Sequence, residues 1–127
     1  MEFHNASVFN KGHKIILVDI DETIATYDTD VRRYDLAKPM QDNINAINEL
    51  YLEGHYIIMW TARGGSEQSK KEGRCYYDFT LSQLESWGVL FHELSTGSKG
   101  NYIKPAFDLV IDDKAMTIDQ LKASRNL

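Results

Sequence analysis

Two aspartates, Asp19 and Asp21, follow a strongly apolar segment and are separated by a single residue. The segment, residues 14–18, is rich in Ile and Val, which is typical of a strand buried on both faces of a parallel sheet. Ligands of open α/β sheets bind at the carboxyl ends of such strands. Side chains two apart on an extended chain point to the same side, so one carboxylate could bind a cation and attack while the other moves a proton. The same residue types also suit an ordinary strand exit, because Asp and Thr favour turns and helix starts.

Polar residues also follow two later apolar segments. One of these segments ends at Thr61, and the other, which Lys104 precedes, ends at Asp112 and Asp113. Parallel strands bring their carboxyl ends to one sheet edge, where the converging carboxylates would repel one another unless a divalent cation neutralised them. An oxygen-only set of ligands suits Mg²⁺, and Thr61 and Lys104 are the right types to hold phosphate oxygens. The pattern therefore predicts a site for phosphoryl transfer.

The remaining sequence supplies the elements that must position these groups. Residues 39–53 and 67–87 have apolar side chains at three- and four-residue spacing and end before a glycine, which predicts two amphipathic helices. A third helix is expected around Ile118 and Leu121. The polar segment 22–38 predicts a flap no larger than a turn or hairpin, and residues 96–101 are expected to form a loop. The expected strands cover residues 14–19, 55–60, 89–92 and 107–111.

The alternation of strands and helices predicts an α/β fold. Right-handed crossovers would give a three-layer, Rossmann-like parallel sheet with helices on both faces. A length of 127 residues suits one domain spanning residues 1–127, because two independent cores would need a longer chain.

The composition of the chain bears on its cellular location and on the classes of partner that it could bind. A net charge of -5 argues against a surface that coats nucleic acid, and no segment has the length of a membrane span. The amino-terminal residues lack the pattern of a secretory signal, and the single Cys75 cannot form an internal disulfide. We therefore expect a cytoplasmic protein that needs neither nucleic acid nor a membrane.

The order of the motifs resembles the haloacid dehalogenase (HAD) superfamily of phosphatases. Residues 19–23, Asp-Ile-Asp-Glu-Thr, match its first motif, and Thr61 meets the second. Lys104 is the natural third-motif lysine, with Lys99 as a rival, and the fourth motif is the acidic pair, so the resemblance covers residues 14–114. Smaller similarities suggest a subset of small members from capsule and surface-polysaccharide gene clusters, and they lie in residues 34–39, 54–55, 61–64 and 104–113.

This resemblance implies roles for individual residues. Asp19 would be the nucleophile that forms an aspartyl-phosphate, and Asp21 would act as general acid and then general base. Mg²⁺ would be held by the Asp19 side chain, the Asp21 backbone carbonyl and a fourth-motif acid. Asp112 is the better candidate for that acid and Asp113 the close second. Both stay open, because Ile111 stands where a glycine often precedes the fourth-motif acid. The transferred phosphoryl group would be bound by Thr61, Ala62 and Lys104.

The resemblance also implies a substrate class and an open site. Neither residues 22–38 nor residues 64–104 can hold the cap domain that most members carry, so an HAD-like core without a cap is expected. The substrate would be a small phosphorylated molecule, such as a sugar phosphate or related metabolite. Either the substrate is bulky enough for an open site, or a neighbour in a homo-oligomer covers the site, or the flap alone suffices. The cations that could bind the anionic part of the substrate are Arg32, Arg33 and Arg63, although each could equally be a solvated surface charge.

Two other functions remain open from the sequence. A receiver-like phosphoacceptor module has a similar length, acidic pairs, a Thr and a Lys-Pro. A nucleotide or polynucleotide phosphatase could use the same fold. The motif order weighs against the receiver, because receivers place the acidic pair at the first strand and the phosphoacceptor in the middle of the chain. It leaves the nucleotide or polynucleotide phosphatase open.

Overall fold

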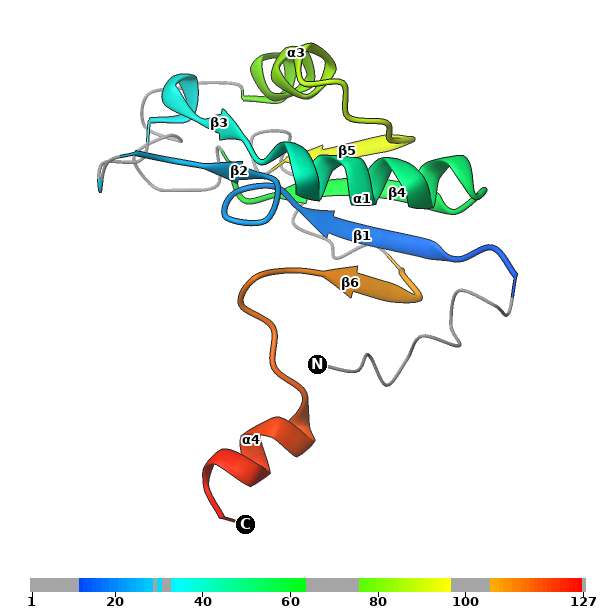
Figure 1. Cartoon of the computed structure of the whole chain (residues 1–127), viewed down its shortest axis with the longest axis vertical. Coiled ribbons are helices and arrows are strands. Elements are labelled where there is room, and N and C mark those ends of the chain that lie inside the picture. Colours follow the sequence, from blue (N-terminus) through cyan, green and yellow to red (C-terminus); the bar gives the residue numbers. More distant parts are fainter. Residues whose placement is uncertain (1–11, 29, 31–32, 64–75, 97–105, 127) are drawn as a thin grey trace.

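The computed structural model describes residues 12–28, 30, 33–63, 76–96 and 106–126, and its main feature is a four-stranded parallel sheet (Figure 1). When the sheet strands are numbered as they occur along the chain, their order across the sheet is 3-2-1-4. The Rossmann strand order begins in the same way. Read across the sheet, they are β5 (Glu93–Thr96), β4 (Tyr56–Thr61), β1 (Ile15–Asp19) and β6 (Leu109–Ile111).

Strand β1 is buried on both faces, as its sequence predicts. Ile16 and Val18 are paired with Ile57 and Met59 of β4, and these four apolar side chains lie on one face with no exposed surface. Leu17, on the opposite face, is also fully buried. Burying one such side chain stabilises the fold by about 1.5–3 kcal/mol, so β1 is anchored from both sides.

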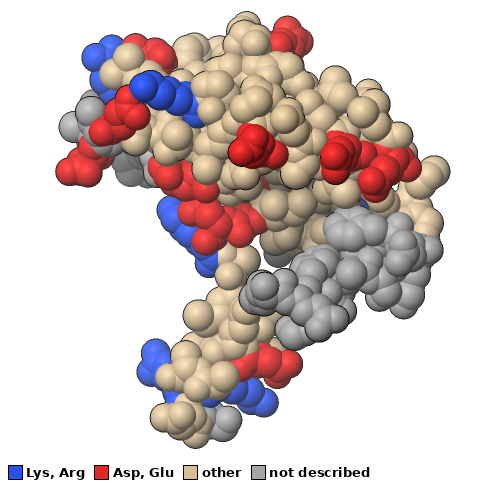
Figure 2. Space-filling view, in the orientation of Figure 1, with Lys and Arg blue, Asp and Glu red and all other residues tan. Residues whose placement is uncertain are grey.

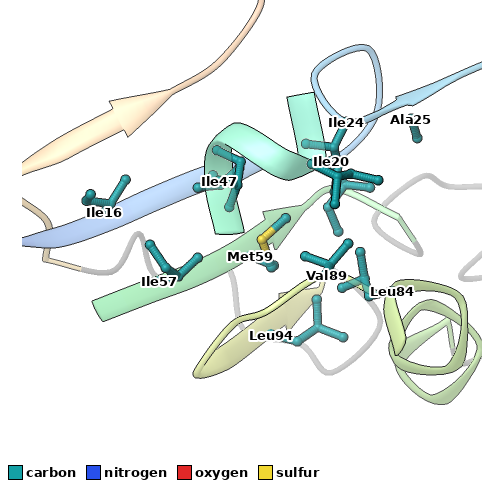
Figure 3. Close-up of a cluster of buried hydrophobic side chains, with 12 residues drawn as sticks. Ile16, Ile20, Ile24, Ala25, Ile47, Ile57, Met59, Leu84, Val89 and Leu94 are labelled. Carbon is teal, nitrogen blue, oxygen red and sulfur yellow. The ribbon is translucent and has the colours of Figure 1, made fainter. Parts of the chain in front are cut away.

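Helices α1 (Gln41–Leu52) and α3 (Tyr77–Ser86) pack on the same face of the sheet. Their buried residues Ile47 and Leu84 join the cluster that contains Ile16 and Met59 (Figure 3). These two helices therefore share one face of the sheet, and helices on the other face stay a prediction. The physical reason is that β1, β4 and β5 follow one another in a single direction across the sheet, so right-handed crossovers place both connecting helices on one side.

The predicted start and stop signals of the first helix are confirmed. Helix α1 begins two residues after Pro39, and Gly54 follows its C-cap residue with a φ of +99°. A Cβ at Gly54 would lie 2.7 Å from the Nε2 atom of His13, so both the backbone angle and the available space require glycine here.

The flap expected over residues 22–38 is a short hairpin. Strand β2 (Ala25–Thr26) pairs antiparallel with β3 (Lys38–Pro39), and a 3-10 turn, η2 (Tyr34–Leu36), lies between them. The Nδ2 atom of Asn43 in α1 donates to the carbonyl of Thr23 at 2.8 Å. This hydrogen bond ties the base of the hairpin to the helix that covers β1.

The strand predicted over residues 89–92 is wrong, because the third sheet strand is β5, four residues later. Residues 89–92 form a connection whose Val89 is buried and whose Leu90 backbone N–H donates to Asn48 at 2.9 Å. The apolar pattern does not indicate this strand, because it ends with Ser95 and Thr96, two polar residues that are nevertheless buried. Thr96 therefore belongs to β5, and the rest of the predicted 96–101 loop lies outside the described residues.

Other sequence expectations hold within the described parts of the chain. The second helix is observed as α3, although the beginning of its predicted range lies outside the described residues. The last strand is β6, and the last helix is α4 (Ile118–Ser124), which projects away from the sheet (Figure 1). Within the described ranges, every helix is too short or too polar to cross a membrane.

Candidate active site

The carboxyl ends of β1, β4 and β6 meet at one edge of the sheet. Asp19 is the last residue of β1, Thr61 the last of β4, and Asp112 directly follows β6. Because Val18 pairs with Ile111, Asp19 and Asp112 leave neighbouring strands at the same level. The strand order reverses between β1 and β6, and ligands of open α/β sheets bind at such a switch point.

Three carboxylates form an acidic cluster at this switch point. Asp19, Asp112 and Asp113 each have a carboxylate oxygen within 4.8 Å of the others, and Figure 2 shows acidic side chains grouped where β1 and β6 end. Burial raises the pKa of Asp19 to about 6, with the negative charge of Asp112 as the next cause. The charges of Asp113 and Asp21 act in the same direction. Among the described residues, the neighbouring carboxylates thus oppose the ionisation of Asp19, and a cation would stabilise the charged cluster.

Asp21 lies beside this cluster but has its own counter-charge. Arg63 binds it with two hydrogen bonds, from Nη2 to Oδ1 at 2.8 Å and from Nε to Oδ2 at 3.1 Å. The hydroxyl of Tyr27 donates to the same Oδ1 at 2.5 Å, and that of Thr61 donates to Oδ2 at 3.5 Å. Two parallel N–H donors on one carboxylate form the strongest type of Arg–Asp pair, so Asp21 is held in a fixed orientation.

Arg63 connects three parts of the molecule. Its side chain has no exposed surface, and its Nη1 donates to Gln83 of α3 at 2.7 Å. The guanidinium carbon lies 4.7 Å from the ring centre of Tyr34, and the side chain of Gln83 donates to the Tyr34 carbonyl at 2.8 Å. The end of β4, helix α3 and the hairpin region are therefore joined at one buried cation. The group of residues around it, here named the arginine clasp, consists of Asp21, Tyr27, Tyr34, Arg63 and Gln83.

The protonation of the clasp follows from its contacts. Burial alone would lower the pKa of Arg63, but the hydrogen bond and charge of Asp21 raise it, so the guanidinium stays charged. Burial and the hydrogen bond to Asp21 both raise the pKa of Tyr27, so the hydroxyl keeps the proton that it donates. The clasp thus combines one cation, one anion and one neutral donor, and its charges balance.

A tight turn after Asp21 begins the hairpin. The carbonyl of Ile20 accepts hydrogen bonds from the backbone N–H groups of residues 23, 24 and 25, and Glu22 has a φ of +69°. This left-handed conformation is uncommon for a residue other than glycine and often marks functional sites. The turn brings the Thr23 hydroxyl back to Asp19, to which it donates at 3.4 Å.

Apart from Arg63, the residues predicted from the sequence fall into three groups in the structure. Asp19, Asp21, Thr61, Asp112 and Asp113 lie together at the sheet edge. The second group is exposed: Ala62 directly follows Thr61, and Arg33 forms an ion pair with Asp35 at 2.9 Å. The residues whose predicted roles lie outside the described part of the chain are Arg32, Lys99 and Lys104.

Arg63 and its partners differ most from the sequence expectations. A solvated surface charge is excluded for Arg63 by its 1% exposure, and its donors are directed at Asp21, Tyr27, Thr80 and Gln83. Tyr27 and Gln83 were not predicted. They lie in a polar flap and inside a helix, where no sequence signal indicates that they approach Asp21 and Arg63.

The fold and the site define an α/β protein with a Rossmann-like parallel sheet and an acidic site at its carboxyl edge. A similar fold occurs in the crystal structure of a target protein from Vibrio cholerae, with a TM-score of 0.53 and 20% sequence identity over 89% of this chain and 99% of that chain. At this identity the similarity concerns the fold alone. Neither a protein-family model nor a curated protein matches the chain.

Proposed function

We propose that this protein is a Mg²⁺-dependent phosphomonoester hydrolase of the HAD type, with Asp19 as the nucleophile. The observation that carries the proposal is the acidic cluster of Asp19, Asp112 and Asp113 at the switch point of the sheet. The reaction itself, phosphomonoester hydrolysis, is inferred from the sequence, because these acids occur in the same order as in the HAD superfamily.

The acidic cluster fits a magnesium ion. Its three carboxylates offer oxygen atoms only, which hard divalent cations prefer, and they lie close enough to share one ion. Asp19 would hold it together with Asp112 or Asp113 and the Asp21 backbone carbonyl. A bound Mg²⁺ would neutralise the repulsion within the cluster and withdraw electron density from the phosphoryl group.

Asp19 and Asp21 divide the reaction between them. A carboxylate oxygen of Asp19 forms a bond to phosphorus while the bond from phosphorus to the leaving oxygen breaks, and Asp21 gives that oxygen its proton. Water then attacks the phosphorus of the aspartyl-phosphate, the bond from phosphorus to the Asp19 oxygen breaks, and Asp21 takes a proton from the attacking water. The products are an alcohol and inorganic phosphate, and both aspartates return to their starting forms.

The arginine clasp supports one half of this cycle directly. In its ion pair with Arg63, Asp21 is the ionised acceptor that the hydrolysis of the intermediate requires. In the first half it must carry a proton, and a neutral carboxyl group binds the guanidinium less strongly than the carboxylate does. We therefore assign Arg63 a positioning role toward Asp21 rather than a role in substrate binding.

The strand order weighs against the receiver-like alternative. Flavodoxin-like domains, which include receivers, have the order second, first, third, fourth and fifth, whereas here the third strand lies at the edge beyond the second. The proposed substrate stays a phosphorylated sugar or related small metabolite. Arg33, exposed near the hairpin, and the predicted Arg32 and Lys104 are the cations available for its anionic groups.

The test replaces the nucleophile. Asp19→Asn should lower the Mg²⁺-dependent release of phosphate from an aryl phosphate by about 1,000-fold or more. Asp78→Asn, the same substitution at an exposed position in the first turn of α3, is the matched control and should keep full activity. Equal turnover by the wild-type protein and the Asp19 variant would contradict the proposal.

A panel of phosphorylated compounds then tests the substrate class. We expect the highest kcat/KM for a sugar phosphate when sugar phosphates, nucleoside monophosphates and 5′-phosphorylated oligonucleotides are compared. A preference for either nucleotide group would favour the nucleotide or polynucleotide phosphatase instead.

A further inference from the structure

The helix layer leaves a groove beside the edge strand β6. Helix α1 crosses over β1 and β4, and α3 lies near β5, whereas β6 lies below α1 at the edge of the sheet (Figure 1). A cavity of about 230 Å³ opens between α1 and the end of β6. Its lining is mainly apolar and includes Ile24, Ala46, Ile47, Leu50 and Ile111.

Helix α4 has an apolar surface that the described residues do not cover. None of its side chains is buried, and Ile118 and Leu121 are 66% and 40% exposed. At about 100° per residue, these two side chains share one face of the helix with Arg125, and Lys122 borders that face. The exposed face of α4 is thus apolar with basic residues beside it.

The groove has the complementary pattern of charge. The α1 residues that line it include Ala46 and Leu50, and the adjacent stripe of the helix, on the side away from the core, is acidic. This stripe consists of Asp42, Glu49 and Glu53, and Figure 2 shows acidic side chains along α1. On α4 it shows both signs of charge, with Asp119 in the first turn and Lys122 in the last. An apolar groove with an acidic rim fits an apolar helix face with a basic rim.

We propose that α4 of one copy docks into the α1–β6 groove of a second copy, and that the exchange is reciprocal. The chain between β6 and α4 contains the acidic pair, and the N–H of Lys114 donates to Asp112 at 2.9 Å in a turn. From this turn α4 projects away from the groove of its own chain (Figure 1). Two equivalent contacts related by a twofold axis would then cover the exposed apolar residues of both copies.

Light scattering on the full chain tests the association. We expect a mass twice the 14.6 kDa of one chain. Leu121→Glu should raise the dissociation constant by about tenfold or more, because it places a charge in the apolar contact and beside the acidic stripe. Ala123→Glu adds the same charge to the opposite side of α4 and is the matched control, with an unchanged mass. A wild-type protein with the mass of one chain at every concentration, or equal effects of the two variants, would overturn the proposal.

Disulfide trapping identifies the copy that supplies the helix. In a Cys75→Ser background, Ala46→Cys and Leu121→Cys place one thiol in the groove and one on α4. When the two single-cysteine proteins are mixed and mildly oxidised, a covalent dimer that contains one chain of each is expected. In the double variant, a disulfide that closes within one chain would contradict the exchange and place α4 in its own groove. Neither result depends on phosphatase activity.

Discussion

The acidic cluster and the arginine clasp lie side by side, but their acids have opposite surroundings. The acid of the clasp is paired with a cation, whereas the acids of the cluster lie near one another. In the clasp, a fully buried guanidinium binds Asp21 through two hydrogen bonds and balances its charge. In the cluster, Asp19 lies near Asp112 and Asp113, and its pKa rises to about 6. The paired charge of Asp21 fixes the position of its carboxylate, whereas the mutually repelling acids around Asp19 are the candidate site for a cation.

The largest effect is expected from removing the compensation in the clasp. Arg63→Gln leaves Asp21, whose side chain is 10% exposed, without its counter-charge, so the free energy of unfolding should fall by about 3–5 kcal/mol in chemical denaturation. Arg33→Gln is the control, because it breaks an exposed pair with Asp35 and should change stability by less than about 1 kcal/mol. Similar losses for the two variants would remove the distinction between the clasp and a surface ion pair.

A smaller effect should follow when one acid is removed from the cluster. Asp112→Asn should weaken Mg²⁺ binding by about tenfold or more, which corresponds to at least about 1.4 kcal/mol, as measured by titration calorimetry. Asp113→Asn should have the weaker effect if Asp112 is the direct ligand. Unchanged affinity in both variants would show that the cluster does not bind the ion.

Removing a charge from the cluster should also stabilise the metal-free protein. The pKa of Asp19 is raised in the folded state from 3.8 to about 6, so its ionisation opposes folding. That penalty is absent below pH 3.8, grows as the pH rises toward 6 and is constant above it. In a chelating buffer, Asp19→Asn should therefore match the wild-type protein near pH 4 and unfold at a higher temperature at pH 8.

The same thermal unfolding experiment can also contradict this prediction. A variant that is less stable than the wild-type protein at pH 8 would mean that Asp19 contributes to folding. The account of uncompensated charge in the cluster would then be wrong.

The smallest change expected is the loss of one donor from the clasp. Tyr27→Phe removes the hydroxyl that donates to Asp21, while both hydrogen bonds from Arg63 stay in place. We expect a loss of about 0.5–1.5 kcal/mol in the free energy of unfolding. Combined with Arg63→Gln, the effect should differ from the sum of the single effects, because both residues bind the same carboxylate. Strict additivity would show that they act independently.

The sequence predicts the acidic cluster better than the clasp, for a physical reason. Strands such as β1 and β4 are recognised by their apolar runs, and parallel strands necessarily bring Asp19 and Asp112 to one edge. The partners of Asp21 depend instead on how the hairpin and α3 return to the sheet, which no local pattern specifies. Arg63 could be identified as a candidate cation, but its burial could not be predicted.

The third sheet strand shows the same limit of pattern recognition. β5 ends with the buried polar pair Ser95 and Thr96, so its sequence is less apolar than the connection before it. The apolar Val89 in that connection packs against the core without being part of a strand. Burial and strand pairing are separate properties. In this part of the chain, the apolar pattern predicts which residues are buried but not which residues pair in the sheet.

Trapping the phosphorylated protein tests the role of Asp19 as nucleophile most directly. Asp21→Asn protein, which should hydrolyse the intermediate slowly, is mixed with Mg²⁺ and an aryl phosphate, quenched in acid and analysed by mass spectrometry. We expect one added phosphoryl group on the peptide that contains Asp19, and none when Asp19 is also replaced by Asn. A phosphoryl group on any other residue, or its persistence in the double variant, would contradict this role.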